Sequence, residues 1–263
     1  MKVVILCGGQ GARLHQETEF RPKPMVEIGD YPILWHIMKI YSHYGFNDFI
    51  LCLGYKGEII RQYFANYEKM NYDCTIHIGS NKAPAIYSRG SRDKWKVTLV
   101  NTGQKSETGM RIKMIEPYIG KSAFMLTYGD GVSDINISKL LKFHRSRKKM
   151  VTITGVHPVE RYGVVEMDSR SNVKAFLEKP LACNLINAGF MVCEPDVIKY
   201  IRGNVTFEAQ PLSTIAKEGG VVCYQHSGFW HSMDTFRDFL RLNRLWNSGV
   251  APWKVWEENH AKR

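Results

Sequence analysis

The chain has 263 residues, of which 44% are hydrophobic, and a formal net charge of +11. This length and composition predict a folded α/β protein with one domain over residues 1–263, and they argue against disorder. No apolar run approaches the roughly 18 residues of a membrane helix, and no signal-peptide cleavage region follows the N-terminus. We therefore expect a cytoplasmic protein without a membrane partner.

The positive charge does not indicate a nucleic-acid partner. Its densest run, residues 142–149, closes a predicted helix, where cations complement the negative end of the helix dipole. Other basic residues are scattered, and no zinc-finger or single-strand-binding signature is present. The six cysteines form no C-x-x-C pair, so we expect them to be reduced, buried and free of zinc.

The first predicted element is an apolar strand at residues 3–6, which runs directly into the glycine loop Gly-Gly-Gln-Gly at 8–11. Glycines allow positive φ and let several backbone N–H groups point at one spot, as phosphate binding requires. The spacing matches neither the Walker A nor the dinucleotide-binding pattern, and a plain tight turn is the alternative. Arg13 and Lys23, the latter between two prolines, favour a phosphate site.

The next elements alternate between helix and strand. The pattern predicts helices at 32–44 and 57–64 and strands at 49–53 and 75–78, hence a parallel sheet with helices on its faces. Residues 79–95 have no periodicity. We expect a mobile excursion there, either a lid or an arm that reaches a neighbouring subunit, with a disordered surface loop as the alternative.

The remainder continues the α/β pattern. We predict a hairpin around the turn 168–172, strands at 97–100, 124–127, 151–154, 185–193 and 221–224, and helices at 137–149, 211–217 and 236–246. Together these elements predict a Rossmann-like three-layer α/β fold with a mixed, mostly parallel central sheet.

Two aspartates follow predicted strands. Asp130 stands between two glycines, and Asp234 precedes the last helix; an Asx turn and a helix N-cap are their respective structural alternatives. Ligands of open α/β sheets bind beyond the carboxyl ends of the strands, where the glycine loop also lies. Two carboxylates beside a phosphate loop suit Mg²⁺, which typically takes one or two carboxylates plus substrate phosphates.

Several motifs carry a family resemblance. GGQGARL, RPKPMVEIGDYPILWHIMK, LTYGDGV, FLEKP, INAGF, HSGFWHSMDT and APWKVWE resemble the sugar nucleotidyltransferases over essentially the whole chain. One departure is Ala12, where the family usually has a threonine whose hydroxyl can reach the nucleotide. The resemblance implies a homo-oligomer in which residues 79–95 contact a neighbouring subunit. It also implies that CTP and α-D-glucose 1-phosphate give CDP-glucose and pyrophosphate for surface-polysaccharide synthesis.

The site residues follow from the glycine loop, the strand-end aspartates and this resemblance. We expect Arg13, Lys23 and Asp130 to be catalytic, and Asp130 and Asp234 to bind the metal. The expected substrate-binding residues are Leu6, Cys7, Gly8, Gly9, Gln10, Gly11, Ala12, Thr102, Arg111, Tyr128, Gly129, Lys179, Asn187 and Gly189. No protein nucleophile is needed, because the attacking phosphate oxygen is already ionised.

The alternatives concern both substrate and activity. The same chemistry with UTP, dTTP or another sugar-1-phosphate stays open. A glycosyltransferase is disfavoured because Asp130 is followed by Gly131 and Val132 rather than by an Asp-x-Asp motif. A non-catalytic nucleotide sensor is the other alternative, favoured by Ala12 and disfavoured by the presence of Lys23 and Asp130.

Overall fold

The computed structural model describes every residue except 10, 12–13, 80, 88–92, 161 and 258–263. An eight-stranded sheet forms its centre, and four neighbouring strands in the order β8–β1–β4–β7 are parallel. These strands are β1 (Lys2–Cys7), β4 (Asp48–Leu53), β7 (Lys96–Asn101) and β8 (Phe124–Tyr128). No helix in the described part combines the length and apolar character needed to cross a bilayer.

The other half of the sheet mixes strand directions. It contains β10 (Val151–Val156), β13 (Ile186–Asn187), β14 (Met191–Cys193) and β15 (Val221–Gln225). Strand β14 runs antiparallel to both β8 and β10, whereas β15 runs parallel to β10. The predicted mixed, mostly parallel sheet is confirmed.

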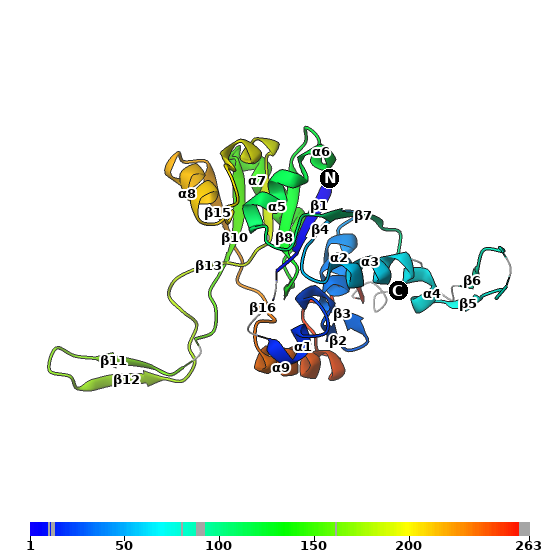
Figure 1. Cartoon of the computed structure of the whole chain (residues 1–263). Helices are drawn as coiled ribbons and strands as arrows, with labels where there is room; N and C mark the ends of the chain where they lie inside the picture. Colours follow the sequence, from blue (N-terminus) through cyan, green and yellow to red (C-terminus); the bar gives the residue numbers. More distant parts are fainter. Residues whose placement is uncertain (10, 12–13, 80, 88–92, 161, 258–263) are drawn as a thin grey trace, which may run out of the picture.

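Helices cover both faces, which gives three layers (Figure 1). One buried cluster includes residues of α2 (Ile33–His43), α3 (Gly57–Ala65), α7 (Ile137–Arg147) and α9 (Phe236–Asn247). The other includes residues of α5 (Thr108–Met114), α6 (Glu116–Ile119), η2 (Pro195–Tyr200) and α8 (Gln210–Lys217). Strand β1 contributes side chains to both clusters, because alternate side chains point to opposite faces of the sheet and all its apolar residues are buried.

Short elements connect the main strands and helices. They are α1 (His15–Thr18), η1 (Lys23–Met25), β2 (Glu27–Ile28), β3 (Tyr31–Pro32), α4 (Tyr67–Asn71), β9 (Gly131–Ser133), β16 (Trp230–Ser232) and η3 (Val255–Glu257). Strands β9 and β16 pair antiparallel, so that Ser232 lies opposite Gly131. This pair joins the end of the central strand β8 to the segment before the last helix.

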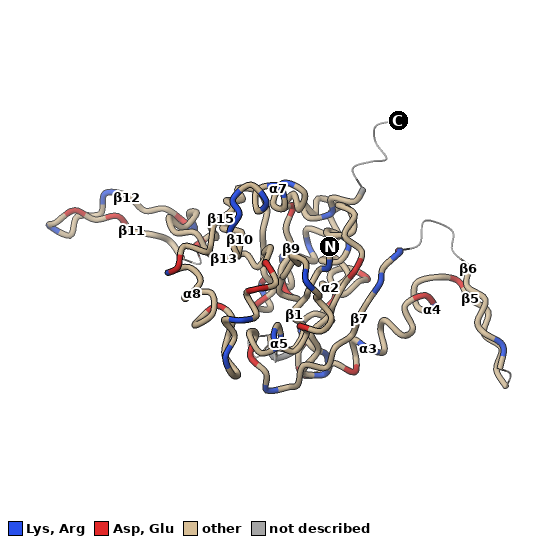
Figure 2. Tube along the Cα trace, turned by 90° about the horizontal axis from the view of Figure 1, so that it is seen from above, with Lys and Arg blue, Asp and Glu red and all other residues tan. Residues whose placement is uncertain are grey.

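Two hairpins project from the body in opposite directions (Figures 1 and 2). One joins β5 (Asp73–Thr75) to β6 (Ala85–Tyr87), and the other joins β11 (Val164–Met167) to β12 (Val173–Leu177). The predicted hairpin around 168–172 is confirmed. The predicted sheet strand at 75–78 is wrong, because Ile76 and Ile78 have no cover and are 57% and 97% exposed.

A glycine breaks the strand predicted at 185–193. Gly189 has a φ of +86°, so the chain leaves the ladder and forms two short strands, β13 and β14, instead of one. The free cysteines include the buried Cys7, Cys52 and Cys193, as expected, but Cys183 and Cys223 are exposed.

The start of α9 provides a stability prediction. The Thr235 hydroxyl accepts the Asp238 N–H at 3.3 Å, and the Asp238 carboxylate accepts the Thr235 N–H at 2.8 Å. Thr235→Ala should lower the free energy of unfolding by about 1 kcal/mol in urea denaturation. The control Thr214→Ala removes a hydroxyl that contacts only an exposed carbonyl within α8, and should change it by less than about 0.5 kcal/mol. Equal losses would show that the cap contributes nothing.

Candidate functional site

A cavity of about 330 Å³ lies where β1 and β8 end, next to the start of α5. Ten of its lining residues were predicted for the site: Leu6, Cys7, Gly8, Gly9, Gly11, Lys23, Arg111, Tyr128, Gly129 and Asp130. Ligands of open α/β sheets bind at this edge. The glycine loop and the end of the central strand therefore share one cavity, as the sequence predicted.

Glycines form part of its wall because larger residues do not fit. A Cβ at Gly8 would lie 2.1 Å from Nη1 of Arg111, and one at Gly129 would lie 3.0 Å from the Leu6 carbonyl oxygen. Gly11 has a φ of +64°, which glycine adopts without strain. Gly8 and Gly129 are thus required because a side chain would not fit, and Gly11 because its backbone is in the left-handed region.

Arg111 is a buried part of this wall and joins two loops. Its guanidinium donates to the carbonyl oxygens of Gly8 at 3.0 Å and Gly103 at 2.8 Å, and to the hydroxyl of Thr102 at 2.8 Å. Burial lowers the pKa of Arg111, although a guanidinium keeps its proton in proteins. Arg111 therefore brings a fixed positive charge to the wall and cross-links the glycine loop to the segment after β7.

Thr102 was predicted as a substrate contact, and its position argues against that role. Its side chain is fully buried, donates to the Leu53 carbonyl at 2.7 Å and accepts from Arg111. It does not line the cavity. Thr102 supports Arg111 from behind, because its hydroxyl already has protein partners on both sides.

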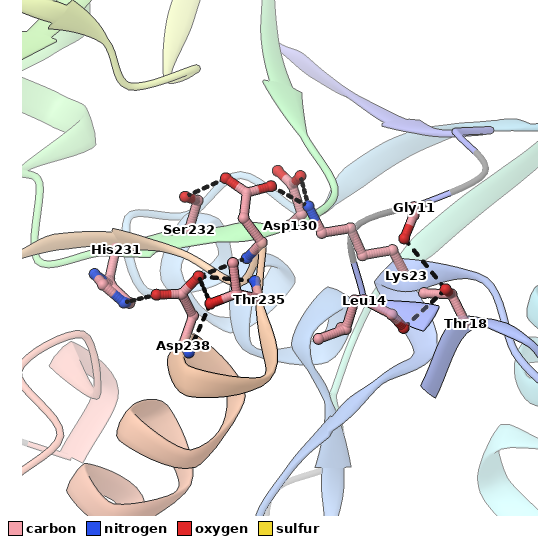
Figure 3. Close-up of polar contacts among 10 residues, drawn as sticks. Gly11, Leu14, Thr18, Lys23, Asp130, His231, Ser232, Thr235 and Asp238 are labelled. Carbon is pink, nitrogen blue, oxygen red and sulfur yellow. Dashed lines mark hydrogen bonds and ion pairs between the residues drawn. The ribbon is translucent and has the colours of Figure 1, made fainter. Parts of the chain in front are cut away.

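Lys23 joins the two predicted metal ligands (Figure 3). Its Nζ lies 2.7 Å from Asp130 Oδ2 and 2.6 Å from Asp234 Oδ1, although 211 residues separate Lys23 from Asp234. Burial alone would lower the pKa of Lys23, but the two carboxylates outweigh it and the pKa is raised. The ammonium stays charged, and the expected convergence of Asp130 and Asp234 is present.

Backbone pairing explains this convergence. The Met233 N–H donates to the Asp130 carbonyl at 2.8 Å, next to the β9–β16 pair. The N-cap of α9 is Thr235, not Asp234, so the alternative reading of Asp234 as an N-cap is wrong. The Asp234 carboxylate instead contacts Lys23 and accepts from the Ser232 hydroxyl at 2.9 Å.

The carboxylates suit a divalent cation. The Lys23 ammonium already acts as a cation between two carboxylate oxygens, and two negative charges with one positive charge leave a net charge of −1. Within the described residues, no group of three or more His, Cys, Asp or Glu is arranged to hold a metal ion. Two carboxylates completed by water and substrate phosphates form the environment that Mg²⁺ accepts.

The cavity wall also contains a thiol, Cys7. Burial raises the pKa of this group well above its usual range. A neutral thiol is a poor nucleophile. Cys7 is therefore not suited to act as a nucleophile in this cavity.

Asn187 and Gly189 were predicted for the site and lie beside it, against Tyr128. The Asn187 amide nitrogen lies 3.4 Å from the Tyr128 hydroxyl, and a Cβ at Gly189 would lie 2.4 Å from the Tyr128 ring. Neither residue lines the cavity. They fix the ring and the hydroxyl of a residue that does.

Lys179 lies away from the cavity. It follows β12 at the base of the projecting hairpin, contacts Glu178 at 2.7 Å and is about half exposed. Its role in substrate binding stays a prediction. Gln10, Ala12 and Arg13 lie outside the described residues, so the predictions made for them stay predictions too.

Sequence reasoning missed four lining residues, Pro24, Ser106, Glu107 and Thr108. Pro24 directly follows Lys23 and could have been included on that ground. The other three come from the segment that leads into α5. Of α5, only Arg111 was predicted for the site.

A glycine-walled cavity with paired carboxylates on a mostly parallel sheet is the arrangement of a phosphate-handling α/β protein. The chain belongs to the nucleotidyl transferase family, whose model matches residues 2–246. Proteins of this family generally use a divalent metal ion.

Similar proteins agree with this assignment. Glucose-1-phosphate cytidylyltransferase of Salmonella typhi is 46% identical over 260 residues, which cover 98% of this chain and 100% of that protein. A Bacillus subtilis (strain 168) protein named "Probable glucose-1-phosphate cytidylyltransferase" is 42% identical, over 97% of this chain and 100% of that protein. The structure of UDP-glucose pyrophosphorylase complexed with UDP-glucose has the same fold, with a TM-score of 0.68 at 17% identity over 94% of this chain and 98% of that chain.

The two glycines of the loop are expected to differ in what they tolerate. Gly8→Ala would make a methyl group overlap the Arg111 guanidinium, which carbonyl oxygens hold in position. The variant should lower the free energy of unfolding by about 2 kcal/mol or more. Gly9→Ala is the matched control, because its Cβ would meet nothing within 4 Å, and it should stay within about 0.5 kcal/mol. Urea denaturation measures both, and indistinguishable values would refute the packing role of Gly8.

Proposed function

We propose that this chain joins CTP and α-D-glucose 1-phosphate to give CDP-glucose and pyrophosphate. The observation that carries the proposal is the Lys23 ammonium between Asp130 and Asp234, at a cavity walled by the glycine loop. The choice of CTP and glucose 1-phosphate is supported by full-length relatives of that name at 42% and 46% identity.

The reaction is a displacement at the α-phosphorus. A phosphate oxygen of the sugar phosphate forms a bond to this phosphorus as the bond to the bridging oxygen of pyrophosphate breaks. Both reactants are anionic, so their mutual repulsion must be offset before they can meet. Asp130 and Asp234 would hold Mg²⁺, which supplies positive charge to the phosphates and alignment of the in-line attack.

The chain's own cations complete this neutralisation. Lys23 is charged and held at the cavity wall, where it can stabilise charge on the departing pyrophosphate. Arg13 is proposed for the same role, on the strength of its place in the loop motif. Backbone N–H groups of Gly8, Gly9 and Gly11 would contact the phosphates, since no side chain stands between them and the cavity.

Other readings have less support. A glycosyltransferase would usually place a second aspartate two residues after Asp130, but Val132 stands there, buried in β9. A non-catalytic sensor would keep the cavity without turnover, and Ala12 favours it.

We further propose a cytoplasmic protein with a single domain and neither nucleic acid nor membrane as a partner. Lys and Arg are spread along the trace and interspersed with acidic residues (Figure 2).

Activity can be tested with purified protein. Each nucleoside triphosphate is offered with glucose 1-phosphate and Mg²⁺, and pyrophosphate release is followed. CTP should be strongly preferred, and a chelator should abolish turnover until Mg²⁺ is restored. Asp130→Asn should lower kcat by about 100-fold or more, because a neutral amide is a weak ligand for Mg²⁺.

The control for that variant is Asp196→Asn, which removes an exposed carboxylate paired with Lys199 at 3.0 Å. It should keep wild-type turnover. A preference for UTP or dTTP would refute the cytidylyl assignment and leave the reaction class intact. Nucleotide binding without turnover by wild-type protein would favour the sensor.

We also propose a homo-oligomer, with residues 79–95 and the β11–β12 hairpin in contact with neighbouring subunits. A two-stranded hairpin is marginally stable alone in water, yet both hairpins project from the body. Their apolar side chains are exposed, including Tyr87 at 56% and Phe176 at 63%. A second copy of the chain would cover such surfaces.

The assembly can be tested by light scattering. Wild-type protein should have a mass that is a multiple of 30.3 kDa. Combining Val165→Lys with Phe176→Glu places opposite charges on a directly opposed pair of the hairpin, which retains the pairing but charges the apolar surface, and should lower that mass without changing the far-ultraviolet circular dichroism. Val250→Glu charges an equally exposed apolar residue elsewhere and should not. A wild-type mass of one chain would contradict the proposal.

A further inference from the structure

Glu208 connects two hydroxyl groups of the cavity wall, and no site motif includes it. One carboxylate oxygen accepts a hydrogen bond from the Tyr128 hydroxyl, and the other accepts from the Thr108 hydroxyl at 2.7 Å. Tyr128 and Thr108 both line the cavity, whereas Glu208 stands behind them. The carboxylate therefore determines which way both hydroxyl protons point.

The backbone around Glu208 is attached to the start of α5. The Gly109 N–H donates to the Val205 carbonyl at 3.0 Å, and the Phe207 N–H donates to the Thr108 hydroxyl oxygen at 2.8 Å. Phe207 is fully buried and anchors the segment in the core. The position of the Glu208 carboxylate is thus set by the fold.

The contact with Glu208 gives the Tyr128 oxygen one chemical character. A tyrosine hydroxyl carries one proton and two lone pairs. Its single proton is directed at Glu208. The Tyr128 oxygen can therefore only accept a hydrogen bond from a ligand.

A lone acceptor next to a carboxylate suits a neutral donor and not a phosphate oxygen, which also brings lone pairs. The Asn187 amide donates to the same oxygen at 3.4 Å, which leaves one lone pair on the Tyr128 oxygen and one further N–H on Asn187 for a ligand. An acceptor beside a donor matches a hydroxyl group, which both donates and accepts. An amino group of a nucleotide base would only donate to the Tyr128 oxygen and could not accept from Asn187.

We propose that Glu208 is a positioning residue that holds Tyr128 as the hydrogen-bond acceptor for one hydroxyl of the sugar phosphate, and so contributes to the choice of sugar. The inference rests on the proposed function, since that function makes a sugar phosphate the ligand. Glu208 acts through Tyr128 and does not itself contact the substrate.

The test variant is Glu208→Gln, which keeps the shape of the side chain but can no longer accept from both hydroxyls. The KM for glucose 1-phosphate should rise by about tenfold, while kcat and the KM for CTP stay within about twofold. Tyr128→Phe should give a similar rise. The double variant should be no worse than either single one, because the two residues act through one contact.

A second readout identifies the hydroxyl. Wild-type protein should discriminate against one of the 2-, 3-, 4- and 6-deoxy analogues of glucose 1-phosphate, and both single variants should lose that discrimination. A merely structural role for Glu208 would leave the discrimination unchanged.

The matched control is Glu218→Gln. Glu218 accepts from the Tyr200 hydroxyl at 2.6 Å, an equivalent contact on the exposed surface. This variant should keep wild-type kinetics and thermal midpoint. An unchanged KM for glucose 1-phosphate in Glu208→Gln, or a rise confined to CTP, would overturn the proposal.

Failure of the proposed function would be seen separately. Absence of turnover by wild-type protein with every substrate pair would refute that function alone. Calorimetric titration of the nucleotide-loaded protein with glucose 1-phosphate then decides the role of Glu208. Binding weakened about tenfold in Glu208→Gln, and not in Glu218→Gln, supports it, and any other pattern refutes it.

Discussion

The ammonium of Lys23 holds together two carboxylates that would otherwise repel each other. Asp130 and Asp234 both contact one nitrogen atom, in a partly buried position where water screens their charges less than at the surface. Removing the Lys23 charge would leave two carboxylates repelling each other, and removing either carboxylate would leave a single negative charge for a divalent ion. The geometry of the cavity mouth therefore depends on this triad, and so does its ability to accept a divalent ion and polyphosphate.

The fold serves the triad in two ways. The parallel strands β1 and β8 end side by side, which brings the glycine loop next to Asp130. The antiparallel pair β9–β16 brings Asp234 to the same place. Because Thr235 is the N-cap of α9, the Asp234 side chain is not needed to cap the helix. Arg111 then ties the glycine loop to the segment after β7 from inside the protein. Rigid backbone pairing positions each charged group.

Sequence reasoning identified the parts of the site that follow directly after predicted strands. Glycines after apolar strands marked the cavity edge, and aspartates at strand ends marked the triad, because both patterns have local causes. Thr102 was misjudged, since nothing in its neighbourhood shows that Arg111 and Leu53 occupy its hydroxyl. Glu208 was missed for the same reason, as its partners are 80 and 100 residues away. The strand at 75–78 failed because apolar residues alone do not reveal whether a neighbour covers them.

The pairing of β9 with β16 also bears on synthesis of the protein. Domains generally begin to fold as the chain emerges from the ribosome, N-terminal segments first. Strands β1, β4, β7 and β8 can assemble early, but the partner of β9 begins only at Trp230. A nascent chain that stalls before Asp234 would present Lys23 and Asp130 without their third member. Such a product would have the sheet and a neutral Lys23–Asp130 pair, but it would lack the second carboxylate for a divalent ion, so a working site forms only after Asp234 has been synthesised.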